Sequence, residues 1–255
     1  EPDLKLLPSV SGWIQVEHAR QAVAEIASWY YDHPSRNIRV VGVTGTNGKS
    51  SVVLLLHQLF RKLGFKTGAF STVSNFINDV AQPSQLTTPD AVSLVREMAA
   101  MVEEGCDYVF MEVSSHALDQ DRVFGIDFDV AVFTNLTHDH LDYHGSFKNY
   151  LNTKKKFFDQ LPDHAVALVN EDDRNAGVMV QNTKARVRTF ALRSLADYHA
   201  KVLDMDFDAM KLQIDGREII THITGKFNAY NLLAVYAVAD CLEIEREELL
   251  RHLSD

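Results

Sequence analysis

Cysteine and long apolar runs are both scarce in this sequence. Only two cysteines occur, Cys106 and Cys241, and no CxxC pair is present, which argues against a zinc ribbon or a disulfide framework and fits a reducing compartment. No run of 18 apolar residues occurs, so we expect no membrane span. The opening residues also lack the pattern of a signal peptide. We therefore expect a cytoplasmic protein.

Basic charge is also in short supply. Lys and Arg number 25 against 35 Asp and Glu, giving a net charge of −10, so the basic stripe of a nucleic-acid binder is not expected. Any bound polyphosphate would need a cation or backbone N–H groups to offset this charge. Hydrophobic residues at 46% and charged residues at 24% are typical of a globular protein. The first residue is Glu rather than Met, so we expect a processed chain or an excised piece of a longer one.

Short apolar strands alternate with amphipathic helices over much of the chain. The predicted strands are 38–43, 66–72, 108–113, 130–134 and 165–169. The predicted helices are 17–31, 50–63, 88–105 with Thr88 as N-cap, 147–161, 228–241 and 245–253. This order predicts an α/β fold, with a mostly parallel P-loop-type sheet and helices on both faces. Alternating segments at 186–192, 199–205, 211–214 and 218–224, with a turn at Asp215-Gly216, predict a small antiparallel β appendage.

A glycine-rich loop at 43–51 gives the strongest functional signal. It reads Val-Thr-Gly-Thr-Asn-Gly-Lys-Ser-Ser, follows a predicted strand and opens a predicted helix. In that context backbone N–H groups and the helix N-terminus can hold phosphate oxygens. Lys49 would reach the β and γ phosphates and the Ser50 hydroxyl would ligate Mg²⁺. Val43 stands where the strict phosphate-loop pattern has Gly, so the loop is a variant.

Acidic and imidazole side chains follow the next two strands. Glu112 closes one strand, and the segment 134–144 after the other contains His138, His140 and His144. Strand ends of this kind meet at the ligand-binding edge of an open α/β sheet. Without the glycine loop these histidines would be read as solvated loop residues; beside it, we expect a divalent cation site. Magnesium is favoured over zinc because phosphate and carboxylate oxygens suit the harder ion.

Taken together, these segments resemble the Mur ligase family of peptidoglycan synthesis. The resemblance is carried by 42–51, 87–89, 111–122, 133–154 and 225–232, and is strongest to the member that adds the third residue of the stem peptide. It implies an ATP-dependent amide-bond ligase in cell wall biogenesis, and hence a role in cell shape and cell division. The enzyme would join a diamino acid, meso-diaminopimelate or L-lysine, to UDP-N-acetylmuramoyl-L-alanyl-D-glutamate through an acyl phosphate.

The resemblance also implies residue roles. The ATP-binding residues would be Gly45, Thr46, Asn47, Gly48, Lys49, Ser50, Ser51, Asn228 and Asn231. The Mg²⁺ ligands would be Ser50, Glu112, His140 and Lys154, with Lys154 carboxylated on its amine (N6-carboxylysine). Lys49, Lys154 and His140 would be catalytic. The UDP-muramoyl-peptide would contact Thr87, Thr88, Ser114, Gln120 and Arg122. The chemistry of the residues alone does not choose among Lys154, Lys155 and Lys156 for the modification.

The same resemblance predicts the domain organisation. Residues 1–37 would be a remnant of an upstream UDP-binding domain with its linker, and 38–255 the central ATP-binding domain. The downstream domain that selects the amino acid would be absent, so we expect a monomer without ligase activity of its own. Three alternatives stay open: a folylpolyglutamate-synthetase-like ligase, a small P-loop kinase, and a nucleotide-binding module without turnover.

Overall fold

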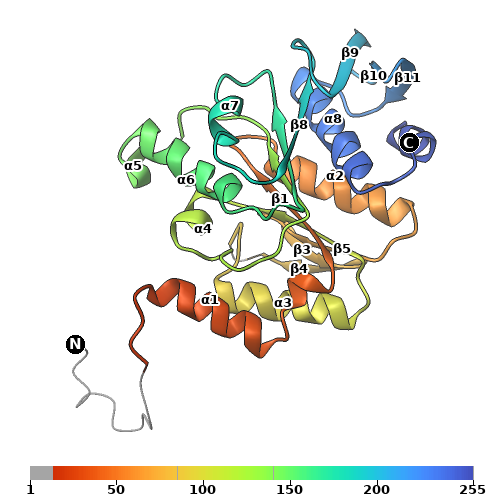
Figure 1. Cartoon of the computed structure of the whole chain (residues 1–255). Coiled ribbons are helices and arrows are strands. Elements are labelled where there is room, and N and C mark those ends of the chain that lie inside the picture. Colours follow the sequence, from red (N-terminus) through yellow and green to blue (C-terminus); the bar gives the residue numbers. More distant parts are fainter. Residues whose placement is uncertain (1–13, 85, 140, 255) are drawn as a thin grey trace.

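The computed structural model describes residues 14–84, 86–139 and 141–254. Within these residues the strands form one sheet, in the order β11-β10-β9-β8-β7-β6-β1-β5-β2-β3-β4, with helices on both faces (Figure 1). The parallel centre comprises β2 (Thr67–Phe70), β5 (Tyr108–Glu112), β1 (Arg39–Thr44), β6 (Val130–Phe133), β7 (Val166–Asn170) and β8 (Arg186–Ala191). The predicted α/β class, with a mostly parallel sheet, is confirmed.

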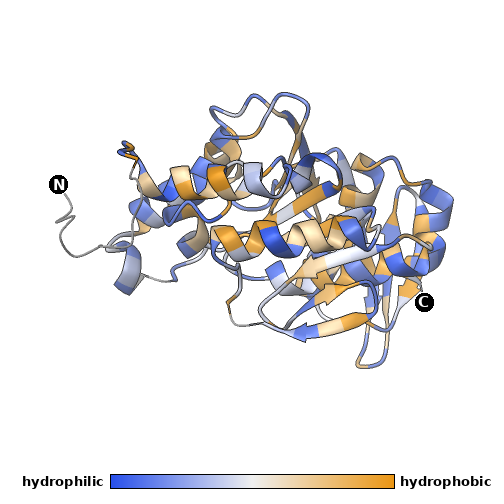
Figure 2. Ribbon diagram, turned by 90° about the horizontal axis from the view of Figure 1, so that it is seen from below, coloured by the Kyte–Doolittle hydropathy of each residue, from blue (hydrophilic) through white to orange (hydrophobic). Residues whose placement is uncertain are grey.

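Each face of the sheet packs against its own set of helices. One face carries α2 (Lys49–Lys62), α8 (Lys226–Cys241) and α9 (Arg246–Leu253). The other carries α3 (Ala91–Glu103), α4 (Ser115–Asp119), α6 (Phe147–Asp159) and α7 (Ala176–Met179). Along β1, Val41 and Val43 face the first core and Val40 the second, as strand alternation requires. Burial on both sides explains why the middle of β1, residues 40–43, carries no polar side chain, and apolar colours are frequent along the strands of the sheet (Figure 2).

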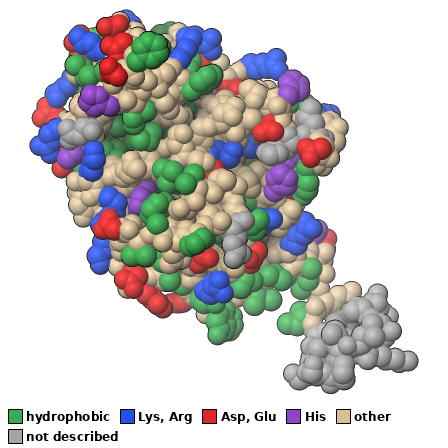
Figure 3. Space-filling view, turned by 180° about the vertical axis from the view of Figure 1, so that it is seen from behind, with side chains coloured by type: hydrophobic (Ala, Val, Ile, Leu, Met, Phe, Trp, Pro, Cys, Tyr) green, Lys and Arg blue, Asp and Glu red, His purple; other side chains and the backbone are tan. Residues whose placement is uncertain are grey.

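The helix that precedes the sheet, α1 (Ala19–Tyr30), lies beside α3 (Figure 1). The 3₁₀ helix η2 (Pro34–Arg36) connects it to β1, and the short α5 (Leu141–His144) precedes α6. No helix in the described part of the chain is long and apolar enough to cross a membrane. On the face shown in Figure 3, basic and acidic side chains of the described residues are interspersed.

The antiparallel part of the sheet differs from the prediction at its start. Strand β8, which was expected in the appendage, pairs in parallel with β7. The antiparallel pairs join β9 (Tyr198–Met205), β10 (Met210–Ile214) and β11 (Arg217–Thr221), and β9 itself adds to β8 in parallel. The appendage is therefore continuous with the main sheet. The turn at Asp215-Gly216 is confirmed, with φ of 50° and 78°.

Two further features differ from the sequence prediction. A hairpin of β3 (Ser74–Ile77) and β4 (Val80–Pro83) extends the opposite edge and was not predicted. Helix α3 is capped by Asp90, whose carboxylate accepts hydrogen bonds from the N–H groups of Val92 and Ser93, so Thr88 is not the N-cap. Thr88 Oγ1 instead donates to the Glu112 carbonyl at 2.8 Å. The Thr88 hydroxyl, which the sequence pattern predicted to cap the helix, therefore bonds to a buried carbonyl of β5 instead.

A buried histidine on α2 makes the stability of the fold depend on pH. His57 is 6% exposed, its Nδ1 lies 2.8 Å from Thr67 Oγ1, and its ring packs on Phe76. Burial, followed by the charge of Arg61, lowers the pKa of His57 from 6.5 to about 4. Between pH 6.5 and pH 4, the His57 imidazole is therefore protonated in the unfolded chain but neutral in the folded protein. The free energy of unfolding should therefore fall as the pH drops from 6.5 to 4, by up to about 3 kcal/mol.

Denaturant unfolding across this pH range would measure the effect. In a His57→Gln variant, which keeps a polar partner for Thr67 but cannot titrate, the slope between pH 6.5 and 4 should be shallower. Equal slopes in the two proteins would contradict the role given to His57.

Candidate nucleotide and substrate site

The glycine-rich loop joins the carboxyl end of β1 to α2, in the strand–loop–helix context that its sequence indicated. Gly45 and Gly48 have φ of 149° and 89°, a region that residues with a side chain rarely adopt. Neither position has room for a Cβ. At Gly45 it would overlap Thr134 Oγ1, and at Gly48 it would lie 2.6 Å from Asn231 Oδ1. The backbone shape of the loop therefore depends on these two glycines.

Two lysines converge on one carbonyl of this loop. Lys49 Nζ donates to the carbonyl oxygens of Gly45 at 3.1 Å and Thr46 at 2.9 Å. Lys154 Nζ, from α6, donates to the same Gly45 oxygen at 3.0 Å and lies 3.3 Å from Thr44 Oγ1. Burial lowers the pKa of Lys49. Burial and the neighbouring charge of Lys49 hold the pKa of the almost fully enclosed Lys154 well below its usual range.

A buried carboxylate meets the start of α2 at the end of β5. Ser50 Oγ donates to Glu112 Oε1 at 2.7 Å, and the Thr72 N–H donates to the same oxygen at 2.7 Å. Glu112 is 1% exposed and has no ion-pair partner within 4 Å among the described residues. A buried carboxylate beside a hydroxyl is an oxygen donor set that fits Mg²⁺.

Of the two remaining predicted metal ligands, only Lys154 lies within the described residues. His140 lies outside the described residues. Lys154 Nζ bonds to Thr44 and Gly45 at the start of the loop, and its hydrogen bonds within the described residues do not reach Glu112 or Ser50. The described part of the chain holds no cluster of three or more His, Cys, Asp or Glu arranged to bind a metal ion.

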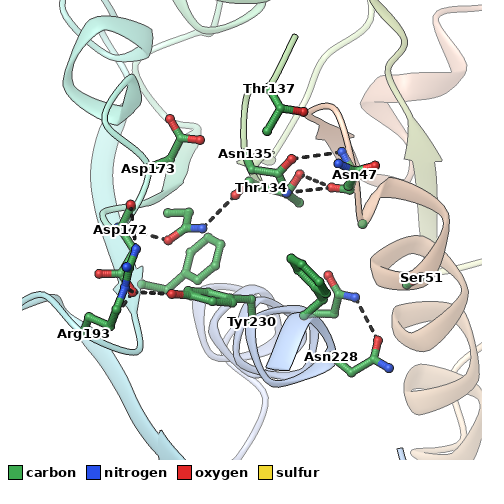
Figure 4. Close-up of a pocket in the computed structure, with 15 residues that line it drawn as sticks. Asn47, Ser51, Thr134, Asn135, Thr137, Asp172, Asp173, Arg193, Asn228 and Tyr230 are labelled. Atoms are coloured by element: carbon green, nitrogen blue, oxygen red, sulfur yellow. Dashed lines mark hydrogen bonds and ion pairs between the residues drawn. The ribbon is translucent and has the colours of Figure 1, made fainter. Parts of the chain in front are cut away.

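A pocket of about 600 Å³ opens beside the loop (Figure 4). Thr134 Oγ1 and Asn135 Nδ2, which follow β6, both donate to the Asn47 carbonyl, at 2.7 and 3.0 Å. Next to the loop, in the first turns of α8, Asn231 Nδ2 donates to Asn228 Oδ1 at 3.1 Å. The two asparagines thus lie in the same pocket as the loop. Its lining residues are Asn47, Gly48, Ser51, Thr134, Asn135, Thr137, Asn170, Asp172, Asp173, Phe190, Arg193, Phe227, Asn228, Tyr230 and Asn231.

The far wall of this pocket contains residues that the sequence analysis missed. The Asp172 carboxylate accepts hydrogen bonds from Tyr230 Oη at 2.7 Å and from the N–H groups of Leu192, Arg193 and Ser194. Burial alone would raise the pKa of Asp172, but these hydrogen bonds hold it well below its usual value. Asp172 fixes the loop after β8 and joins it to α8. The sequence signal that could have identified Asp172 is its position two residues after the buried strand β7.

The residues assigned to the muramoyl-peptide form a connected group. Arg122 donates from Nη1 to the Thr88 carbonyl at 2.8 Å and from Nε to Gln120 Oε1 at 2.9 Å. The Ser114 N–H donates to Thr88 Oγ1 at 3.2 Å. Thr87 precedes Thr88 directly, so all five predicted residues lie in one region. Gln120 and Arg122 also line a hollow of about 360 Å³ between α1 and the start of α3.

The chain was compared with known families and proteins. The model of the Mur ligase middle domain matches residues 43–239. A UDP-N-acetylmuramoyl-L-alanyl-D-glutamate–2,6-diaminopimelate ligase of Parabacteroides distasonis is 52% identical over 242 residues, which cover 95% of this chain and 50% of that protein. The enzyme of the same name from Geobacillus kaustophilus is 40% identical over 239 residues, covering 90% and 48%. This chain therefore spans about half the length of these relatives.

Solved structures agree with the sequence matches. A structure of a UDP-N-acetylmuramoyl-L-alanyl-D-glutamate–2,6-diaminopimelate ligase superposes with a TM-score of 0.82 at 26% identity, covering 96% of this chain and 52% of that one. A Mycobacterium tuberculosis folylpolyglutamate synthase superposes with a TM-score of 0.71 at 17% identity, covering 92% and 62%. The second likeness concerns the fold alone.

Proposed function

Because the chain belongs to the Mur ligase family, we propose that it is the ATP-binding part of the ligase that adds 2,6-diaminopimelate to UDP-N-acetylmuramoyl-L-alanyl-D-glutamate. The relative at 52% identity bears the name of that reaction. One observation carries the proposal: Lys49 Nζ lies over the glycine loop, and the hydroxyl of the next residue, Ser50, donates to the buried carboxylate of Glu112. The similarity to a folylpolyglutamate synthase at 17% identity gives that alternative no comparable support.

The reaction would proceed in two steps. The side-chain carboxylate of the substrate's D-glutamate attacks the γ-phosphorus of ATP, the bond to ADP breaks, and an acyl phosphate forms. An amine of diaminopimelate then attacks the acyl carbon and phosphate leaves. Lys49 would exchange the carbonyls of Gly45 and Thr46 for phosphate oxygens and balance the charge on the migrating group. The pocket walled by Asn228 and Asn231 would take the remainder of the nucleotide.

The protein's contribution to metal binding would centre on Ser50 and Glu112. Their oxygen atoms would hold Mg²⁺, which when bound offsets the charge of the phosphate oxygens. His140 and a carboxylated Lys154 complete the ligand set in our proposal. The need for a cation follows from the charges, because a chain of net charge −10 brings an anionic nucleotide and an anionic substrate together.

Calorimetric titration of this chain with ATP tests the metal and nucleotide proposal. We expect Mg²⁺ to raise the affinity for ATP by about tenfold or more over EDTA-treated protein. Glu112→Gln, which keeps the shape but removes the charge, should lose most of that gain. Glu97→Gln is the matched control, since Glu97 on α3 is a half-buried carboxylate that accepts a hydrogen bond from Asn75 on β3. Equal Mg²⁺ dependence in Glu112→Gln and the wild type would count against the site.

Lys154 is the lysine we propose to be carboxylated. A carbamate forms from CO₂ and a neutral amine, and burial lowers the pKa of Lys154 well below its usual range, which favours the neutral form. With ¹³C-bicarbonate, ¹³C NMR should show one carbamate signal that disappears in Lys154→Met and persists in Lys156→Ala, whose lysine is exposed. A signal that survives in Lys154→Met would place the modification elsewhere.

We also propose that residues 38–255 are the central ATP-binding domain and that 1–37 belong to an upstream UDP-binding domain and its linker. Helix α1 belongs to residues 1–37 and packs beside α3. In this arrangement the chain acts as a monomer in the cytoplasm and does not form the tripeptide without further domains.

A further inference from the structure

One hydroxyl of the glycine loop joins three segments of the site. Thr46 Oγ1 lies 3.2 Å from Tyr150 Oη on α6. The same atom accepts a hydrogen bond from the Thr137 N–H at 3.0 Å and lies 3.3 Å from the Thr137 carbonyl. The backbone N–H of Thr46 donates to the Asn135 carbonyl at 2.8 Å. The loop, the segment after β6 and α6 therefore meet at this residue.

Tyr150 forms part of the enclosure of Lys154. It is 1% exposed and lies one helical turn before Lys154, on the same face of α6. Lys154 Nζ lies 5.0 Å from the centre of the Tyr150 ring. The ring is held at its inner end by α6 and at its outer end by the contact with Thr46. A shift of the ring would therefore move both the loop and the lysine.

We propose that Tyr150 is a positioning residue whose hydroxyl, paired with Thr46, holds the glycine loop in register with Lys154. The inference rests on the proposed nucleotide-binding role of the loop. Phenylalanine in its place would fill nearly the same volume but remove the Tyr150 hydroxyl, so that the Thr46 hydroxyl would keep its contacts with Thr137 and lose the one with α6. The loop would then lose one of its links to α6 and keep the bond from Lys154 to the Gly45 carbonyl, and part of the binding geometry for phosphates would have to be restored when ATP binds.

A double-mutant cycle on this chain tests the pairing. We expect Tyr150→Phe and Thr46→Val each to weaken Mg·ATP binding by about three- to tenfold in calorimetry, as for the loss of one hydrogen bond. The double variant should lose no more than the stronger single variant, because both remove the same contact. Thr46→Ser, which keeps the hydroxyl, should restore most of the affinity. Additive losses would overturn the proposed pairing.

Tyr236 provides the control for a purely structural effect. It is a fully buried tyrosine on α8 whose hydroxyl donates to Asp215 at 2.6 Å, away from the loop. Tyr236→Phe should lower the melting temperature at least as much as Tyr150→Phe and leave ATP affinity unchanged. If the two variants weakened ATP binding equally, the role of Tyr150 would be structural and the inference would fail.

The carbamate signal separates this inference from the proposed function. In the ¹³C NMR experiment, Tyr150→Phe should need several-fold more bicarbonate than the wild type to reach half occupancy of Lys154, and Tyr236→Phe should not. A wild-type chain that binds no Mg·ATP would overturn the proposed function and the inference with it. A wild-type chain that binds Mg·ATP, beside a Tyr150→Phe variant with equal affinity, would overturn the inference alone.

Discussion

Lys49→Ala should weaken ATP binding by about a hundredfold or more, the largest loss we expect from any single side chain. Lys49 is the first residue of α2 and its ammonium group is already folded over the loop, on the carbonyls of Gly45 and Thr46. On binding it would exchange two neutral acceptors for charged phosphate oxygens, in surroundings where burial limits screening by water. Alanine removes this interaction and leaves the phosphate charge to the backbone N–H groups and the proposed Mg²⁺.

Calorimetric titration with Mg·ATP would measure this loss. Lys62→Ala is the matched control, because Lys62 lies on the same helix at its exposed far end. It should bind ATP as the wild type does. Unchanged affinity in Lys49→Ala would contradict the proposal that the glycine loop binds the phosphates of ATP.

Gly45→Ala should abolish nucleotide binding and also destabilise the fold, by about 1–3 kcal/mol. A Cβ at this position would overlap Thr134 Oγ1, and the φ of 149° would be strained for any residue other than glycine. Thr134 has little freedom to yield, because its hydroxyl donates to the Asn47 carbonyl on the same loop. Relief of the overlap would therefore displace the loop itself.

Two other glycines separate the causes of this effect. Gly125 also has a positive φ, of 76°, but open space around its Cα, so Gly125→Ala should show only the backbone strain, about 1 kcal/mol. Gly177 lies in α7 with open space and no positive φ, so Gly177→Ala should be neutral or slightly stabilising. Denaturant unfolding and ATP titration of the three variants would test this order. A Gly45→Ala protein that behaves like Gly177→Ala would contradict the account of the loop.

Much of this architecture could be predicted because local and global signals agree. The run from Val40 to Val43 is buried on both faces, so its apolar character marked a central strand. The glycine loop is governed by backbone requirements that only a few residues meet, which makes its sequence readable without a structure. The position of Glu112 followed from the rule that strand ends gather at one edge of a parallel sheet.

The features that escaped prediction depend on partners distant in the sequence. Whether a strand pairs in parallel or antiparallel is decided by its neighbour, so the alternation in β8 did not reveal that it extends the parallel sheet beside β7. Thr88 followed by Pro89 resembles a helix start. The buried carbonyl of Glu112 needs a hydrogen-bond donor, however, and the Thr88 hydroxyl bonds to it instead of capping the helix. Asp172 gains its role only from N–H groups beyond β8 and from Tyr230 on α8.

The close approach of Asn231 to Gly48 brings α8 against the loop of the first strand-to-helix unit, β1 to α2. During synthesis on the ribosome, the glycine loop emerges long before this asparagine does. The phosphate-binding half of the pocket can therefore fold early, but the cleft closes only after the segment through α8 has left the exit tunnel. A growing polypeptide would therefore hold the glycine loop without a complete nucleotide cleft until α8 has also emerged.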